Sequence, residues 1–140
     1  MRSIKTYIGS ILLLLVFTLD LPGATYASVT AHIMNDLSPN EVIRVHCKSS
    51  RGDDRGSHDI EFTHEFSWNF KVTGVLKFTC VTIFDDEREA RCFDAYDDGR
   101  DYFRCQNDCK WMVTKGKLLL GYDEHVGYWE LFQFNPPCLL

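Results

Sequence analysis

The sequence lacks the short motifs that mark common hydrolases, metal sites and nucleotide-binding proteins. No G-x-S-x-G, H-E-x-x-H or phosphate-binding glycine loop occurs in its 140 residues. None of its six cysteines is spaced C-x-x-C, the close pair on which zinc sites are usually built. We therefore expect no metal, no cofactor and no catalytic residue in this chain.

Basic charge and long apolar segments are also scarce. The chain has 15 Lys and Arg against 20 Asp and Glu, a net charge of −5. Nucleic acids and anionic membranes require a positive surface, so both are poor partners for this protein. The one long apolar run, residues 8–19, is shorter than the roughly 20 residues that a membrane-spanning helix needs. We expect no nucleic-acid partner and no insertion into a membrane.

The N-terminal segment has the order of a secretory signal peptide. Two basic residues precede the apolar run, and the small residues Thr25 and Ala27 stand at positions −3 and −1 of a cleavage site. We predict that residues 1–27 are a signal peptide and that residues 28–140 form one secreted, extracellular domain. Removing the signal peptide leaves a net charge of −6.

The cysteines all lie in the predicted mature domain. An even number of cysteines in a small exported chain indicates a disulfide framework. Their spacing alone leaves the pairing open. Each bridge is expected to stabilise the fold by about 2–4 kcal/mol, mainly by restricting the unfolded chain. The six are Cys47, Cys80, Cys92, Cys105, Cys109 and Cys138.

Alternation of apolar and polar residues dominates the rest of the sequence and indicates short, half-buried β-strands. Turn residues separate these runs at 51–56 and 115–117, and residues 97–108 form the longest predicted polar loop. The pattern predicts an all-β fold, an antiparallel β-sandwich of two sheets with about seven to nine short strands stapled by disulfides. The clearest runs are 29–33, 42–45, 59–63, 65–71, 76–80 and 110–114.

A series of ordered motifs resembles the plant self-incompatibility S-protein family, which includes the stigma S-proteins of poppy. The motifs follow one another in the family's order across nearly the whole predicted mature domain. They are Ile33-x-Asn35, Val45-His46-Cys47-Lys48-Ser49, Asp53-Asp54-x-Gly56-x-His58, Phe66-x-Trp68-x-Phe70, Phe93-Asp94-x-Tyr96, Arg100-Asp101, Arg104-Cys105 and Cys109-x-Trp111.

This resemblance implies a secreted two-sheet sandwich in which the family's usual four cysteines form two bridges. Those four fall here on Cys47, Cys80, Cys105 and Cys109, and we expect a third bridge between the additional Cys92 and Cys138. Family members with a known role are stigma ligands, which a membrane receptor on incompatible pollen recognises, triggering calcium entry and growth arrest. The resemblance therefore implies a non-enzymatic, monomeric ligand of a plasma-membrane receptor in cell–cell recognition, with rejection of self pollen as one such process.

The predicted loop at 97–108 is the candidate receptor-binding site. Rigid strands that display a charged loop with aromatic and Arg anchors suit specific recognition. The alternative is an ordinary solvated loop with Tyr102 or Phe103 packed into the core. The candidate contact residues are Asp97, Asp98, Arg100, Asp101, Tyr102 and Arg104.

Three other interpretations deserve comparison. The segment 52–58 is a second candidate loop, in which Asp53 and Asp54 are expected to bind backbone N–H groups and Gly56 to supply a positive φ. His64 stands in a segment that faintly resembles the first active-site block of secreted plant ribonucleases, but the second histidine block is missing. A secreted defence or toxin-like protein is the main functional alternative, and the acidic net charge argues against it.

Overall fold

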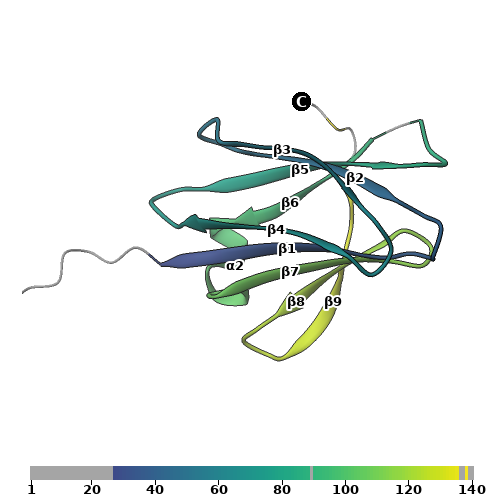
Figure 1. Cartoon of the computed structure of the whole chain (residues 1–140). Coiled ribbons are helices and arrows are strands. Elements are labelled where there is room, and N and C mark those ends of the chain that lie inside the picture. The colour runs from purple at the N-terminus through teal and green to yellow at the C-terminus, as the bar shows by residue number, and fades with distance from the viewer. Residues whose placement is uncertain (1–26, 89, 136–137, 139–140) are drawn as a thin grey trace, which may run out of the picture.

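The structure of this protein is a computed structural model, and it describes residues 27–88, 90–135 and 138. The predicted signal peptide, except for Ala27, lies outside these residues. Within the described residues, nine strands and one short helix form two layers (Figure 1). They are β1 (Ser28–Asp36), β2 (Ile43–Ser49), β3 (Asp54–Ile60), β4 (Glu65–Lys71), β5 (Lys77–Phe84), β6 (Arg91–Asp97), α2 (Asp98–Arg104), β7 (Asp108–Thr114), β8 (Leu118–Asp123) and β9 (Tyr128–Phe132).

The predicted two-sheet sandwich is confirmed. One sheet has five strands in the order β4-β1-β7-β8-β9, and the other has four in the order β3-β2-β5-β6. The pairing of β1 with β7 is parallel, whereas all other neighbouring strands run antiparallel. A parallel pair needs a long connection, and here the whole four-stranded sheet separates β1 from β7 in the sequence.

Alternating burial explains why these segments form strands. In β1, Val29, Ala31 and Ile33 are buried, and the residues between them lie on the outer face. Asn35, also fully buried, donates from Nδ2 to the Glu41 and Ile60 carbonyl oxygens at 2.7 and 2.9 Å. Because β1 and β3 belong to different sheets, this amide joins the two layers, and both of its N–H donors are paired.

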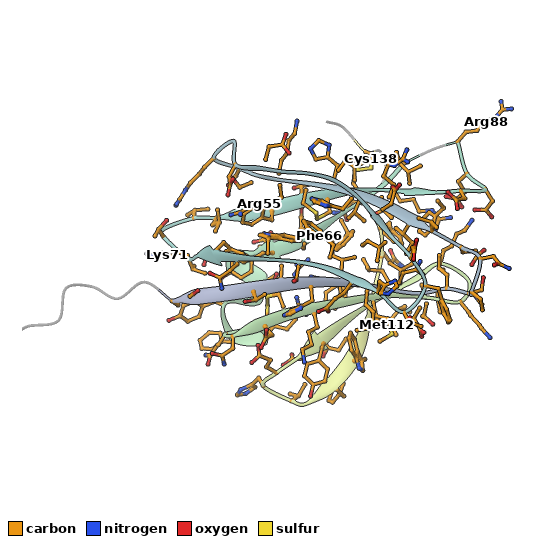
Figure 2. All side chains as sticks on the ribbon, in the orientation of Figure 1. Arg55, Phe66, Lys71, Arg88, Met112 and Cys138 are labelled. Atoms are coloured by element: carbon orange, nitrogen blue, oxygen red, sulfur yellow. A yellow bond between two sulfur atoms is a disulfide. The ribbon has the colours of Figure 1, made fainter. Side chains whose placement is uncertain are left out.

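Aromatic pairs fill the space between the sheets. Trp68 contacts Phe78 edge-on with ring centroids 5.5 Å apart, and Phe93 meets Trp111 at 5.3 Å. In each pair the two rings come from opposite sheets, so these contacts hold the layers together in the geometry that aromatic rings prefer. Figure 2 shows the side chains packed between the two layers.

Three disulfides staple the sandwich. Cys47–Cys80 links the neighbouring strands β2 and β5, and Cys105–Cys109 closes the short segment between α2 and β7. Cys92–Cys138 ties β6 to the segment that follows β9. The segment after β9 continues from the five-stranded sheet, and β6 is an edge strand of the four-stranded sheet. This third bridge therefore connects the two sheets.

Two segments differ from the sequence prediction. Strand β3 begins at Asp54, inside the predicted turn at 51–56, and ends at Ile60. Residues 61–63, predicted as strand, instead form a turn in which Thr63 has a φ of 69° and donates its N–H to the Asn35 carbonyl oxygen. The second difference is helix α2, which occupies most of the predicted loop at 97–108.

Candidate recognition surface

Helix α2 begins at a strong local capping signal. Asp97 is its N-cap, and the Asp97 side chain accepts a hydrogen bond from the Gly99 N–H at 3.1 Å. The Asp98 N–H donates to the Leu76 carbonyl oxygen, which fixes the start of the helix to the beginning of β5. The predicted polar loop is thus corrected to a helical segment, in which the charged side chains of Arg100, Asp101 and Arg104 contact one another.

Three residues, Arg100, Asp101 and Arg104, form what we call the α2 network. The Asp101 carboxylate is completely buried and accepts two hydrogen bonds from Arg100 and one from Arg104, at 2.6–2.8 Å. It also accepts from the Asp97 backbone N–H at 2.8 Å. A buried carboxylate with this many donors is fully satisfied, which offsets much of its desolvation cost.

The charges of this network set the protonation of the groups around it. Burial acts to raise the pKa of Asp101, but hydrogen bonds from Arg100 and Arg104 outweigh it and hold that pKa below its ordinary value. Burial, together with the charges of Asp98 and Asp101, raises the pKa of the Tyr96 phenol to about 12. At neutral pH Asp101 is therefore ionised and Tyr96 is neutral.

The two guanidinium groups stack on buried aromatic rings. The Arg104 guanidinium lies 4.5 Å from the Trp111 ring centroid, and Arg100 lies 5.1 Å from the same ring. Gly121 permits this close packing: a Cβ there would lie 2.8 Å from a Phe132 carbon and 3.0 Å from an Arg104 nitrogen. The two arginine side chains of α2 thus pack against Trp111, which is buried on the inner face of the five-stranded sheet.

Two hydrogen bonds join α2 to the end of β8 and to the turn between β8 and β9. The Glu124 N–H donates to the Arg104 carbonyl oxygen at 2.8 Å, and Arg104 Nη1 donates to the Tyr122 carbonyl oxygen at 2.8 Å. Figure 1 shows α2 and this turn at the same end of the sandwich. The Cys105–Cys109 bridge restrains the chain directly after the helix.

This end of the molecule exposes large apolar side chains on a rigid base. Tyr102 and Phe103 are 60% and 68% exposed and pack edge-to-face on each other, while Val126 and Tyr128 are 48% and 56% exposed. We call these four residues the recognition surface. Exposed aromatic residues on an ordered scaffold are the anchors that most protein interfaces use.

The predicted contact residues divide into two groups. Arg100 and Tyr102 are exposed, and Asp97 and Asp98 are partly exposed. Burial removes Asp101 and Arg104 from any surface that a partner could contact, so their place in the structure is to position the helix. The sequence did not indicate Val126 or Tyr128 as contact residues. Only the fold brings the β8–β9 turn next to α2.

The second candidate loop, residues 52–58, lies partly in β3. Asp54 accepts a hydrogen bond from the Gly56 N–H at 2.8 Å, and Gly56 has a φ of 77°. This hydrogen bond is the first of the causes, followed by that with His46, that lower the pKa of Asp54. These contacts are local and shape the backbone of the segment.

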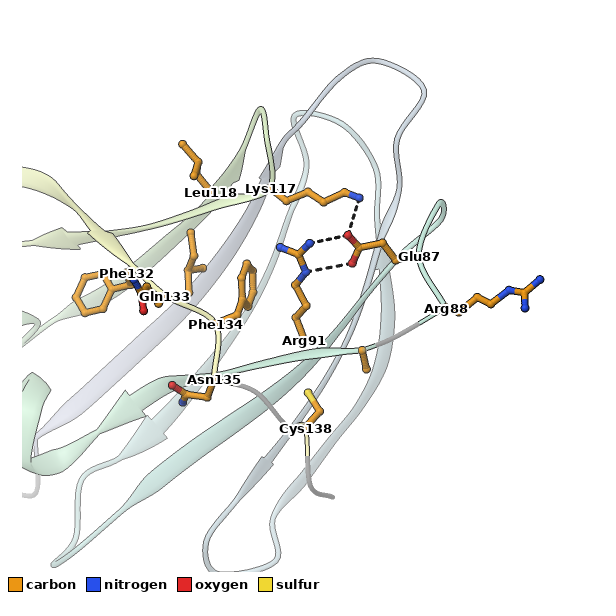
Figure 3. A pocket seen from close by; sticks show the side chains of 12 residues that line it. Glu87, Arg88, Arg91, Lys117, Leu118, Phe132, Gln133, Phe134, Asn135 and Cys138 are labelled. Carbon is orange, nitrogen blue, oxygen red and sulfur yellow. Dashed lines mark hydrogen bonds and ion pairs between the residues drawn. The ribbon is translucent and has the colours of Figure 1, made fainter.

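A separate pocket of about 1010 Å³ opens at the other end of the sandwich. Its apolar wall includes Phe132 and Phe134, and Arg88 is one of its charged lining residues (Figure 3). The other three, Glu87, Arg91 and Lys117, contact one another, and we call them the pocket network. Glu87 accepts hydrogen bonds from Lys117 at 2.8 Å and from Arg91 at 2.6 Å, and these contacts lower its pKa. Glu87 pairs with both cations, and Asp86 pairs with Lys117 at 2.8 Å, so an anionic ligand would compete with two carboxylates.

The residues considered for catalysis are dispersed. The His64 side chain is 69% exposed and contacts Glu61 at 3.6 Å. Within the described ranges, no hydrogen bond or ion pair joins His64 to a second histidine, as the paired acid and base of a ribonuclease would require. No group of three His, Cys, Asp or Glu side chains suited to a metal ion occurs in that part of the chain.

Comparison with known proteins gives one consistent result. Residues 30–133 match the family model described as plant self-incompatibility protein S1. S-protein homolog 5 of Arabidopsis thaliana is 30% identical over 102 residues, covering 72% of this chain and 78% of that protein. S-protein homolog 29 and S-protein homolog 19 of the same plant are 26% and 30% identical over 91 and 89 residues, covering 64% and 61% of this chain. The chain spans just under two thirds of the length of these last two relatives, 64% and 63%.

Proposed function

The chain belongs to the plant self-incompatibility protein S1 family, and from this premise we propose that it is a secreted, non-enzymatic, monomeric ligand recognised by a cell-surface receptor. The observation that carries the proposal is the recognition surface, four exposed apolar side chains on α2, on the β8–β9 turn and at the start of β9. The buried Asp101–Arg104 ion pair positions α2 in this surface. A preorganised surface loses little conformational entropy on binding, which suits a ligand that must be recognised selectively.

Secretion of the protein is supported by two features. Its first 27 residues have the order of a signal peptide, and disulfides such as these three persist in oxidising, extracellular compartments. In the described part of the chain, no helix has the length and apolar character to cross a bilayer. Expression of the tagged full chain in plant cells should deliver protein to the apoplastic fluid with Ser28 as its first residue. Retention inside the cells with Met1 in place would contradict secretion.

The receptor contact can be tested by surface binding. Fluorescently labelled protein should bind to pollen tubes or protoplasts of the source plant, and the Tyr102→Ser/Phe103→Ser variant should bind about tenfold or more weakly. The matched control is Ile83→Ser, since Ile83 is also an exposed apolar residue, 41% exposed, on β5 of the other sheet. Equal binding of the double variant and the control would remove α2 from the contact.

A growth assay distinguishes the biological roles open to such a ligand. Growing pollen tubes exposed to the secreted protein should stop and take up calcium on some pollen genotypes and not on others if the protein takes part in rejection of self pollen. Binding to vegetative cells with no effect on any pollen genotype would place the ligand in development or defence instead.

A further inference from the structure

The two sheets of the sandwich have four edge strands: β4 and β9 in one sheet, and β3 and β6 in the other. An edge strand carries backbone N–H and C=O groups that pair readily with a further strand, so proteins usually cover or charge their edges. The four edges of this protein differ in how far they are covered.

The edge of β6 is covered by the segment that follows β9 and by α2. The Asn135 N–H donates to the Cys92 carbonyl oxygen at 2.6 Å, and the Cys92–Cys138 disulfide holds that segment in place. Arg100 Nη2 donates to the Asp94 carbonyl oxygen, also at 2.6 Å. Two carbonyl groups along this edge are therefore occupied.

The edges of β3 and β4 cover each other. Arg55 Nη2 on β3 donates to the Asn69 carbonyl oxygen on β4 at 3.5 Å, and the His58 ring stacks on Phe66 with centroids 3.8 Å apart. His58 Nε2 also contacts the Arg55 carbonyl oxygen at 2.7 Å. Charged side chains such as Asp59 add a further barrier to strand pairing along β3.

Strand β9 has no comparable cover. Across the ranges that the structure describes, no hydrogen bond from a loop or a side chain reaches the backbone of residues 128–132. The strand contains no proline or lysine, and its Tyr128 and Leu131 side chains are 56% and 65% exposed. Figure 1 shows β9 as the outermost strand of its sheet.

An apolar row on the outer sheet face leads to this edge. Leu131 pairs with Leu120 on β8, and Leu120 pairs with Met112 on β7. Leu120 and Met112 are only partly buried, so the row continues to the open edge of the sheet without a polar break. A strand added at β9 would extend this row with its own alternate side chains.

The charge of the edge selects among possible occupants. Glu130 is partly exposed, and no hydrogen bond or ion pair joins its side chain to any residue that the structure describes. In antiparallel self-pairing centred on this residue, two Glu130 carboxylates would stand opposite each other, a destabilising arrangement. The net charge of −5 adds to the repulsion between two copies. A cationic segment meets neither obstacle.

We infer that β9 is a docking edge for an extended segment of a partner protein, with alternating apolar residues and a Lys or Arg opposite Glu130. The inference rests on the proposed function for the existence of a protein partner, and it adds the conformation and charge of the segment that binds. Main-chain hydrogen bonds supply affinity in this mode of recognition, and the alternate side chains supply specificity.

The test uses a defined probe, an acetylated octapeptide of alternating valine and lysine, with a valine–glutamate octapeptide as its counterpart. In NMR spectra of isotope-labelled protein, the lysine peptide should shift the amide signals of residues 128–132 and slow their hydrogen exchange. Leu131→Lys should weaken this binding about tenfold or more, because it adds positive charge to an edge that must receive a cationic strand. The matched control Ile83→Lys, on the other sheet, should leave it unchanged.

A charge exchange makes the test specific. The Glu130→Lys variant should lose affinity for the lysine peptide and gain affinity for the glutamate peptide. The NMR spectra of Glu130→Lys and Leu131→Lys should both remain those of a folded sandwich. Shift changes spread over other acidic residues, or insensitive to Leu131→Lys, would overturn the inference. A concentration-dependent dimer in sedimentation that Leu131→Lys abolishes would also overturn it, by making a second copy the occupant.

The inference and the proposed function fail separately. If the peptide does not bind at β9 while cell-surface binding still depends on Tyr102 and Phe103, the docking edge is wrong and the receptor ligand stands. If the peptide binds at β9 with the expected charge exchange but no cell surface binds the protein, the docking edge stands without the proposed receptor.

Discussion

The two ends of strand β6 carry the same chemical arrangement in different surroundings. Near its first residue, Glu87 lies between Arg91 and Lys117, which pack over the ring of Phe84. Beyond its last residue, Asp101 lies between Arg100 and Arg104, which pack over Trp111. In both networks one carboxylate bridges two cations on an aromatic base.

Burial is the difference between the two networks. The Asp101 side chain is 0% exposed, whereas that of Glu87 is 23% exposed. Water and salt screen an exposed ion pair, so its removal costs little. Removing one partner of a buried pair leaves an uncompensated charge in a medium of low polarity. The α2 network therefore determines the structure of its end of the molecule, and the pocket network only steadies a surface turn.

The largest effect is expected for Asp101→Ala. This change leaves the Arg104 guanidinium buried without its anion, and we expect the free energy of unfolding to fall by about 3–5 kcal/mol. The measurement is urea unfolding of the purified, disulfide-intact protein. Asp101→Asn keeps the shape of the side chain and serves as a second variant should the alanine form fail to fold.

Glu87→Ala is the matched control, since it removes the bridging carboxylate of the pocket network in the same way. Equal losses of stability in the Asp101 and Glu87 variants would show that burial does not decide the energy of these networks. A large loss in the Asp101 variant alone would show that it does.

Much of the fold was predictable from the sequence, because it is encoded in local alternation. The buried positions of β1 and β4 follow directly from period-two patterns such as Phe66-x-Trp68-x-Phe70. The parallel pairing of β1 with β7 was not predictable, because it depends on how two distant segments pack and not on either pattern alone.

The structure of the candidate site was not predicted, since a helix stands where the sequence indicates a loop, and its role as a receptor contact stays a prediction. The sequence singles out residues 97–108, yet a charged run with Gly99 in it has the composition of a solvated loop. What turns it into a helix is long-range: Trp111 and Gly121 provide the surface on which Arg104 packs. Two features of the local sequence favour a helical turn. Asp97 is a residue type that caps helix N-termini, and Asp101 and Arg104 are three residues apart, the spacing at which side chains pair on a helix.

An effect of intermediate size is expected for the dependence of the unfolding free energy on pH. The pKa of Asp101 is lowered in the folded protein, so the stability it contributes is complete above the unfolded-state value of about 3.9 and is lost as the pH falls through the lower folded value. We expect the difference in unfolding free energy between the natural protein and Asp101→Asn to be constant near neutral pH and to shrink below about pH 4. Urea unfolding at a series of pH values measures it. A difference that grows as the solution becomes more acidic would contradict the ionised, hydrogen-bonded state of Asp101.

The smallest effect is expected for Glu87→Gln, and it completes the comparison. The amide keeps the size of the side chain and its oxygen can still accept hydrogen bonds, but its NH2 group replaces one accepting oxygen, so the charge and part of the hydrogen bonding are lost. Because the pocket network is partly exposed, the free energy of unfolding should fall by less than about 1 kcal/mol. Raising the salt concentration should reduce even this difference, since exposed charges are screened over a few ångströms to about 10 Å. The corresponding Asp101→Asn difference should respond much less to salt, because ions do not reach the buried carboxylate. If both differences vanished together in salt, the α2 network would behave as a surface network, and the rigid base of the recognition surface would need another cause.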